Sequence, residues 1–504
     1  MRYLRVRSVT GPKRPWFIAG ALALAGVSGC GNQYRPVVTP ITPTGPASAP
    51  QSYVVAYSQP NLTSPQTGAS SPCPNTTSTT SPGIVTLIDF SGDTVLAQAN
   101  LGTGPLTFSL DASGSTAYST NCDGTVSTVP LSTTLQSKNV LTTTLPSTVD
   151  SSGKAVNTLS TNILVTSAGE YVAEPTTVDL QGQPAVGVLT NNTSGVASLK
   201  QEIPVAPSLV NVTGTSAGQR IYAISQGNST NGSGVTWGQC DNPTSVSTNG
   251  EADGIDVASN TLSSQLPVGI CPVYGLMTPD GRRAFILNRG SGTITVIDSV
   301  KNQLDTSSTS SYLTNATIQN IGSVGKGPVH ADYYAPASLL VTANYDDDSI
   351  SVISVPINGA VNGYTDAPTF GQVLATVKLK PGSHPAAVTI LQDGSRAYVA
   401  DEGDGTVSVV NLSSFTVQSV LPVNGHPRAI VSTYNAPIGK VYTIANDSPY
   451  MTVIRTDTNI VSASILLQGN GVDVRTTTQY SATSSTTTSA NNNTQSRSAG
   501  SGAP

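Results

Sequence analysis

The sequence predicts an all-β protein folded as a closed β-propeller, a ring of four-stranded blades. The first observation is a recurring hairpin unit, seen at residues 113–129, 280–298 and 393–412. Each copy has a turn with Gly, a short apolar strand, a polar loop and a second strand that begins Gly-Thr-Val or Gly-Thr-Ile. The second observation is composition: 10% of residues are charged, whereas 47 are Gly and 34 are Pro, which favours strands and turns over helices. A unit that repeats along a chain buries its faces against its neighbours, so the repeat predicts a ring of similar blades.

Each unit expands to four strands, named a, b, c and d in chain order. Strands b and c form the hairpin, strand a often follows a Gly-x-x-Pro step, and strand d is rich in Val and Leu. The steps end at Pro105, Pro272, Pro328 and Pro385, with variants that end at Pro207 and Pro427. Eight d-like runs predict eight blades; they begin near Leu96, Val140, Ala197, Ser263, Ala316, Leu374, Val417 and Ser462.

The two ends of the repeat region predict how the ring closes. The first unit begins directly at strand b, at Tyr53, and an unassigned strand follows the last unit at residues 471–477. We therefore expect the C-terminal strand to complete the N-terminal blade, because closure removes free sheet edges that would promote aggregation. The predicted propeller covers residues 53–475.

The amino-acid sequence of the repeat resembles that of a known family. The strings "RRAFILNRGSGTITVID" at 282–298 and "SRAYVADEGDGTVSVVNL" at 395–412 resemble the YVTN family of β-propeller repeats. The resemblance covers about residues 53–475, and it implies seven blades as the alternative to eight, with the weak third unit at 160–177 as the one to fail. It also implies a possible activity, since the lactonase-like propellers that share this wording hydrolyse sugar-acid lactones or related esters.

The N-terminus has the pattern of an export signal. Basic residues precede an apolar run at 16–27 that is too short to span a bilayer comfortably and ends in small residues. Val27-Ser28-Gly29-Cys30 resembles a bacterial lipobox, which implies that residues 1–30 are a lipoprotein signal and that Cys30 is lipidated. A plain signal peptide with an incidental cysteine is the alternative. Gly31 follows Cys30 in place of Asp, so the resemblance implies a lipid anchor at the outer membrane or cell surface.

Low-complexity segments flank the predicted propeller. Residues 31–52 are rich in Pro, Thr and Ser and are expected to form an extended tether. Residues 476–504 are rich in Ser, Thr, Asn and Gly without hydrophobic spacing, so we expect a disordered tail.

The remaining cysteines are expected to form two disulfides in an exported chain. Cys73, Cys122, Cys240 and Cys271 allow three pairings. Because strands alternate in direction, the b–c loops and d–a connections share one face of a propeller. Cys73 and Cys122 lie in b–c loops of neighbouring blades, and Cys240 and Cys271 flank one blade on that face, which predicts pairs 73–122 and 240–271. A metal site is the alternative, but no C-x-x-C spacing is present.

Candidate ligand-binding side chains lie on the same face. His384 and His426 directly precede prolines in consecutive d–a connections, whereas His330 lies inside a strand a. The b–c loops of three consecutive blades carry carboxylates, which are Asp346, Asp347, Asp348, Asp401, Glu402, Asp404 and Asp447. Oxygen ligands favour calcium and imidazoles favour zinc, so this rim is the predicted cation site. The alternative is that these acidic tips serve only hairpin geometry, and no other cofactor is predicted.

Two classes of function follow. A net charge of -5 without a basic stripe argues against a nucleic acid partner. The G-x-S-x-G string at 214–218 falls in a turn between strands, so Ser216 is expected to be a turn residue and not a nucleophile. The first class is a binding or scaffold protein, anchored to the membrane through Cys30, whose loop-bearing face takes a protein, peptide or glycan. The second is a lactonase-like hydrolase, which we consider less favoured because the chain has only three His.

Overall fold

The computed structural model describes residues 53–62, 73, 81–89, 92–149, 151–191, 197–215, 218–227, 235, 238–241, 246–306, 310–318, 324–360, 363–433 and 439–477. All of them belong to one compact unit, residues 50–504, which is distinct from residues 1–49. The predicted signal, Cys30, the tether, Ser216 and the tail beyond Thr477 lie outside the described residues. Within the described part, no helix is long and apolar enough to cross a membrane.

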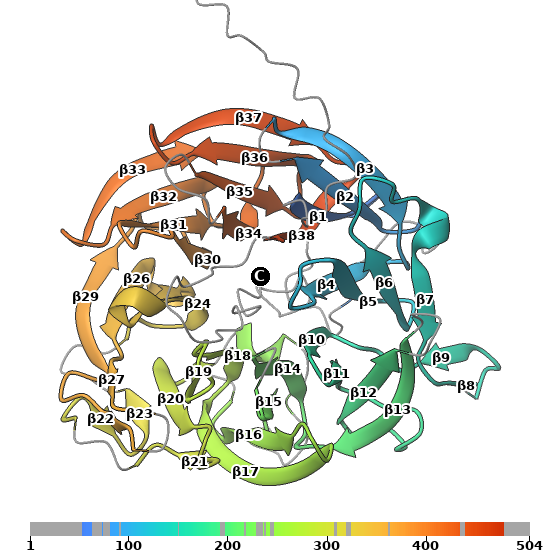
Figure 1. Cartoon of the computed structure of the whole chain (residues 1–504), viewed down its shortest axis with the longest axis horizontal. Coiled ribbons are helices and arrows are strands. Elements are labelled where there is room, and N and C mark those ends of the chain that lie inside the picture. The colour runs from blue at the N-terminus through green and yellow to red at the C-terminus, as the bar shows by residue number, and fades with distance from the viewer. Residues whose placement is uncertain are drawn as a thin grey trace, which may run out of the picture. The chain divides into compact units, whose positions relative to one another are not determined.

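Eight antiparallel blades follow one another around a common axis (Figure 1). From the innermost strand outward, blade 1 contains β38 (Asn470–Thr476), β1 (Tyr53–Gln59), β2 (Ile84–Asp89) and β3 (Thr94–Asn100). Blade 2 contains β4 (Pro105–Leu110), β5 (Thr116–Asn121), β6 (Thr125–Pro130) and β7 (Leu141–Thr144). Blade 3 contains β10 (Asn162–Thr166), β11 (Gly169–Glu174), β12 (Ala185–Asn191) and β13 (Ala197–Pro204). Blade 4 contains β14 (Leu209–Gly214), β15 (Arg220–Ser225), β16 (Asn249–Asp256) and β17 (Thr261–Ile270).

The second half of the ring has the same strand order. Blade 5 contains β18 (Pro272–Met277), β19 (Arg283–Asn288) and β20 (Thr293–Asp298), with its outer position taken by β21 (Gln303–Leu304), β23 (Thr317–Ile318) and β22 (Leu313–Thr314). Blade 6 contains β24 (Pro328–Tyr334), β25 (Leu339–Asn344), β26 (Ser349–Ser354) and β29 (Gln372–Lys378). Blade 7 contains β30 (Pro385–Ile390), β31 (Arg396–Asp401), β32 (Thr406–Asn411) and β33 (Thr416–Pro422). Blade 8 contains β34 (Pro427–Ser432), β35 (Lys440–Ala445), β36 (Tyr450–Arg455) and β37 (Ile460–Leu466).

Short elements decorate the blades. Two small hairpins pair outside them, β8 (Ser147–Val149) with β9 (Ala155–Asn157), and β27 (Ile357–Asn358) with β28 (Thr365–Asp366). Single turns of 3₁₀ helix are η1 (Ser137–Asn139), η2 (Gln239–Asp241), η4 (Ala335–Ala337) and η5 (Tyr345–Asp347).

The count of eight blades is confirmed, including the weak third unit, which forms a complete four-stranded sheet. Ring closure is confirmed as well. The C-terminal strand β38 pairs antiparallel with β1 along its length and also contacts β34 and β4, the innermost strands of the two neighbouring blades. The pairing extends to Thr477, whose N–H donates to the carbonyl of Tyr53, slightly beyond the predicted boundary at residue 475.

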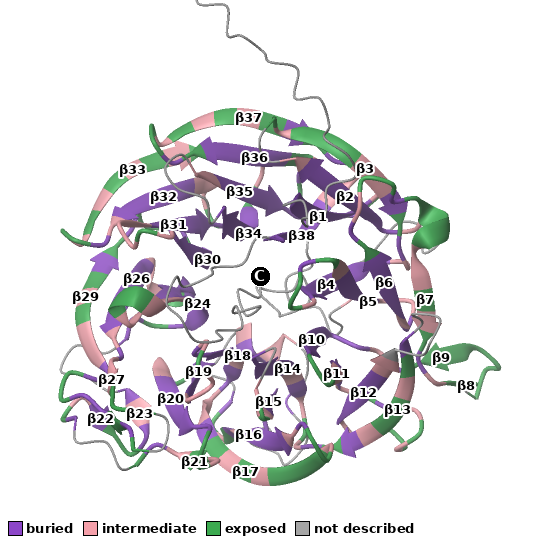
Figure 2. Ribbon diagram, viewed as in Figure 1, coloured by how far each residue is buried: buried purple, intermediate pink, exposed green. Residues whose placement is uncertain are grey.

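Burial follows position within the blade. The inner three strands of each blade are almost entirely buried, whereas outer strands such as β33 and β37 alternate between exposed and half-buried residues (Figure 2). Inner strands pack against neighbouring blades on both sides, which explains their unbroken Val, Ile and Ala content, as in "PAAVTI" of β30. Aromatic rings fill the wider gaps between blades: Tyr57 of blade 1 stacks on Phe108 of blade 2 at 4.1 Å between ring centroids.

The two faces of the ring carry different connections. We call the side with the b–c loops and d–a connections the loop face, and the side with the a–b and c–d connections the turn face. Both predicted disulfides are present on the loop face, Cys73–Cys122 between blades 1 and 2 and Cys240–Cys271 around blade 4. Each one ties down a long b–c insertion that has little apolar content of its own.

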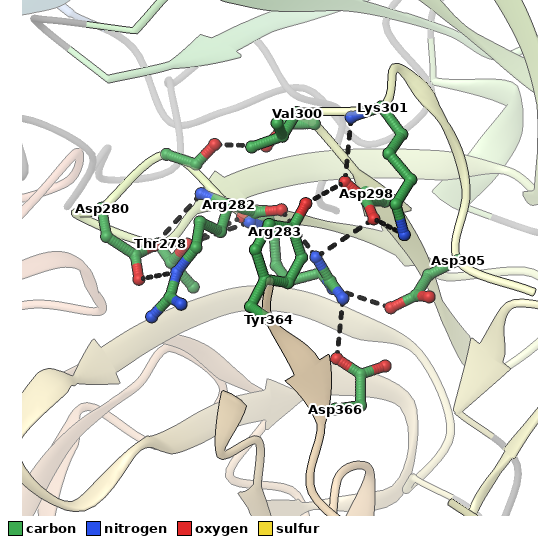
Figure 3. Close-up of polar contacts among 12 residues, drawn as sticks. Thr278, Asp280, Arg282, Arg283, Asp298, Val300, Lys301, Asp305, Tyr364 and Asp366 are labelled. Atoms are coloured by element: carbon green, nitrogen blue, oxygen red, sulfur yellow. Dashed lines mark hydrogen bonds and ion pairs between the residues drawn. The ribbon is translucent and has the colours of Figure 1, made fainter. Parts of the chain in front are cut away.

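On the turn face, a buried arginine connects blades 5 and 6 through ion pairs (Figure 3). Arg283, at the start of β19, is 2% exposed and ion-pairs with Asp305 at 2.7 Å, Asp366 at 2.8 Å and Asp298 at 3.5 Å. Its guanidinium also lies 4.9 Å from the ring centre of Tyr364. Asp305 directly follows β21 of blade 5 and Asp366 belongs to the β27–β28 hairpin of blade 6, so one side chain joins two c–d insertions. Although burial disfavours the charged form, the three carboxylates raise the pKa of Arg283.

Candidate functional site

His384 is held on the loop face in a costly backbone conformation. It has a φ of 44°, at the position directly before the innermost strand, which is left-handed in other blades as well: blades 2 and 6 have Gly104 and Gly327 there, and blades 4 and 5 have Ser208 and Cys271. Side chains are disfavoured in this left-handed region, and a residue that is held there is a candidate for function. Asp348 stabilises the bend by accepting the backbone N–H groups of His384 and Gly382 at 2.9 and 2.8 Å.

The His384 ring is oriented by its neighbours. Its Nδ1 lies 3.0 Å from the carbonyl oxygen of Tyr345, and because a carbonyl only accepts, Nδ1 carries the proton. The ring also stacks on Tyr345 with 4.9 Å between centroids, and the guanidinium of Arg289 covers Tyr345 at 5.1 Å. The side chain of His384 remains 46% exposed. In the neutral ring, Nε2 therefore offers a fixed lone pair to solvent.

His426 has a similar arrangement in the next blade. Its Nδ1 and its backbone N–H both bind the carboxylate of Asp447, at 2.5 and 2.9 Å. Although partial burial acts to raise it, these hydrogen bonds lower the pKa of Asp447. The side chain of His426 is 58% exposed. The loop of residues 402–405 lies between the two histidines, since Gly403 abuts His384 and Gly405 abuts Gly425.

Most of the predicted rim carboxylates are engaged by cations. Asp346 binds Arg289 at 2.9 Å, Asp347 binds Lys378 at 3.0 Å and Asp404 binds Lys380 at 2.9 Å. Glu402 is nearly buried and binds Arg428 at 2.8 Å. The carboxylates thus fasten neighbouring connections to one another, a role that needs no ligand.

Asp401 lies inside blade 7 and not on the rim, which corrects its predicted placement. It is the last residue of β31, is fully buried, and accepts hydrogen bonds from the hydroxyls of Thr406 and Ser408. Burial, with a contribution from Asp404, raises the pKa of Asp401 to about 8. Blade 6 has Asn344 at the same position, whose amide donates to Ser349 and Ser351. The position is a structural polar link between strands b and c.

Replacing this carboxyl should change how stability depends on pH. The folded-state pKa of Asp401 lies above its unfolded value, so folding takes up a proton between about pH 4 and pH 8, and stability falls as pH rises through that window. We expect Asp401→Asn to be more stable than the parent at pH 9 by about 1–3 kcal/mol and nearly equal to it at pH 4, by urea unfolding. The exposed Asp457→Asn is the control, and an unchanged pH dependence in Asp401→Asn would contradict this account.

The structure gives no support to the predicted cation site at the rim, which stays a prediction. Within the described ranges, no group of three or more His, Cys, Asp or Glu is placed to hold one metal ion. His330 is also removed from the loop face: it is buried in β24, where its Nδ1 accepts the N–H of Val388 from the next blade at 3.3 Å. What the structure does bring onto one surface is the pair His384 and His426 with their oriented rings.

Sequence reasoning missed the residues that orient this pair. Tyr345 and Arg289 contact His384 and Tyr345 respectively from earlier blades, so no spacing within one repeat predicts them. Only Arg289 had a signal in the sequence. It is a basic residue in the b–c loop at 288–290, where the b–c loops of other blades have acidic or small residues.

Comparison with known proteins adds little to the site. No protein-family model matches the chain, and no curated protein sequence matches it. The YVTN resemblance therefore rests on the wording of the repeat and stays a prediction.

Several solved structures are similar in fold at low identity. AztD from Citrobacter koseri is 13% identical, with 84% of this chain and 98% of that chain covered and a TM-score of 0.49. The periplasmic gluconolactonase PpgL of Pseudomonas aeruginosa is 15% identical, with 84% and 99% covered and a TM-score of 0.47. A putative 6-phosphogluconolactonase from Bacteroides fragilis is 12% identical, with 86% and 99% covered and a TM-score of 0.46. Likeness at this level says nothing about ligand or reaction.

Proposed function

We propose that this chain is an exported, lipid-anchored propeller that binds a ligand on its loop face, at the surface between His384 and His426. The observation that supports it is that the exposed ring of His384 is held in one orientation. Other blades place Gly, Ser or Cys in the same left-handed conformation, whereas this one places an imidazole there and orients it through the carbonyl oxygen and the ring of Tyr345.

The chemistry of the surface indicates the kind of ligand. When its ring is neutral, each histidine presents one acceptor, Nε2, because Nδ1 is occupied by Tyr345 or Asp447. Fixed acceptors on consecutive blades suit a partner that displays O–H or N–H donors, as a glycan or an extended peptide does. The loop between them offers Asp404, which is already paired with Lys380, so charge is not the main determinant of recognition. Cys30 would anchor the propeller to the membrane.

Binding is tested with glycan and peptide arrays probed with the soluble domain. We expect His384→Ala combined with His426→Ala to weaken binding to every glycan or peptide that the parent binds by at least tenfold, because both oriented acceptors are lost. Thr458→Ala, in the exposed c–d turn of blade 8 on the opposite face, is the matched control and should bind as the parent does. Equal binding by the double variant would contradict the proposal.

A hydrolase is the second candidate, on one specific observation. His426 and Asp447 form a dyad in which Nδ1 is held by a carboxylate and Nε2 is open to solvent, the arrangement of a general base. Aldonolactone turnover by the soluble domain that is lost in His426→Ala and retained in Thr458→Ala would favour the hydrolase over the binding protein.

A further inference from the structure

In several blades the last residue of strand b is an Asn that donates a hydrogen bond to strand c. Blade 3 has neither this Asn nor its partner. In blades 2, 5 and 6 this residue is Asn121, Asn288 and Asn344. Each amide donates to a hydroxyl two residues into strand c, at 2.9, 2.9 and 3.0 Å. The pair links strands b and c near the loop face, and each group satisfies the other's buried polar atom.

Blade 3 replaces both members of that pair. Glu174 stands in place of the Asn, and Gly187 stands in place of the Ser or Thr on strand c. A Cβ atom on Gly187 would lie 2.6 Å from Oε1 of Glu174, so the missing side chain leaves room for the carboxylate. Gly187 pairs with Glu202 of β13, and Glu174 therefore reaches across strand c toward a second carboxylate.

These carboxylates lack neutralising partners. Glu174 is fully buried, and its one side-chain hydrogen-bond partner within the described residues is the other acid, Glu202, with which it shares a proton; no other donor reaches the oxygens of Glu174 or the buried Oε1 of Glu202. Burial and then the charges of Glu202 and Asp179 raise the pKa of Glu174 to about 9. No Lys, Arg or His in the described part of the chain ion-pairs with any of the three, whereas Asp401 of blade 7 has two hydroxyl partners and Glu402 has Arg428.

We propose that Glu174 and Glu202 bind a hard divalent cation, with calcium preferred, at the loop-face end of blade 3. Two carboxylates that converge without donors supply oxygen ligands of the kind that calcium takes in irregular, high-coordination sites. Waters and backbone carbonyls would complete the coordination, and Asp179, which is exposed, adds negative charge at the entrance. Magnesium fits less well because it demands a small, regular octahedron.

The test is a titration of CaCl₂ into the purified, chelator-treated protein by calorimetry, together with melting temperatures in calcium and in chelator. We expect one calcium per chain, a higher melting temperature with calcium, and a weaker response to MgCl₂. Glu174→Gln should weaken calcium binding at least tenfold. Asp401→Asn, which alters a buried carboxyl of blade 7, is the matched control and should bind calcium as the parent does.

The measurements distinguish a calcium site from a pair of glutamate side chains that only share a proton. If Glu174→Gln does not fold, the half-buried Glu202→Gln provides the same measurement. The proposal is wrong if the parent gives neither heat nor a shift in melting temperature with calcium. It is also wrong if Glu174→Gln and Glu202→Gln bind calcium as the parent does, since the ion would then lie elsewhere on the acidic surface.

Discussion

Removing residues 470–504 should abolish cooperative folding of the propeller. The deletion takes away β38, which pairs with β1 and contributes Val472 and Val474 to the apolar clusters on both sides of blade 1. It also leaves β1 as an exposed edge in the middle of what was a closed ring, which favours aggregation. We expect the truncated chain to be insoluble or to unfold without a sigmoidal transition, as measured by circular dichroism during heating.

The matched control is a shorter truncation. Deleting residues 478–504 keeps β38 and the bond between Thr477 and Tyr53, so it should unfold at the same temperature as the full chain within a few degrees. A synthetic peptide of residues 470–477 added to the longer truncation should restore some cooperative unfolding. The account of ring closure would be contradicted if both truncations behaved like the full chain.

The second large effect is expected from Arg283→Met. This substitution leaves the buried Asp305 and Asp366 without their cation, whereas Asp298 loses Arg283 but keeps its ion pair with Lys301. Breaking a buried ion-pair network from one side costs about 3–5 kcal/mol, so we expect a loss of that size in urea unfolding. The insertions of blades 5 and 6 should also become sensitive to protease, because Arg283 is their shared contact (Figure 3).

Further substitutions test whether the loss of stability in Arg283→Met comes from the ion-pair network. Arg282→Ala removes a more exposed ion pair with Asp280 and should cost no more than about 1 kcal/mol. Combining Arg283→Met with Asp305→Asn and Asp366→Asn should recover part of the lost stability, because two of the uncompensated charges are gone. A cost below about 1 kcal/mol for Arg283→Met would show that the network is not a major source of stability.

The architecture was predictable because its signals are local and repeated. Turn glycines, the alternation of strands b and c, and the Gly-x-x-Pro steps recur within each unit, so even the weak unit at 160–177 was counted correctly. The pairing of Cys240 with Cys271 followed from strand direction together with the assignment of both residues to the connections of the fourth blade. The candidate site was less predictable. Asp401 and Glu402 are adjacent in the sequence, but one is buried between strands and the other binds Arg428 of the next blade.

The repeat in the sequence was sufficient to establish eight blades, the closure of the ring by residues 471–477 and the face that carries His384 and His426. Tertiary structure decided which charges are neutralised and which rings are oriented, because those contacts join segments that are distant in the sequence, from 21 residues apart for His426 and Asp447 to 57 for Arg289 and Asp346. It also gives most carboxylates on the acidic rim of blades 6 to 8 a cationic partner, whereas Glu174 and Glu202 of blade 3, where we propose a cation, have none among the described residues. The reason is physical: a carboxylate in the sequence is only a potential ligand, and its availability depends on whether the folded chain already supplies a partner.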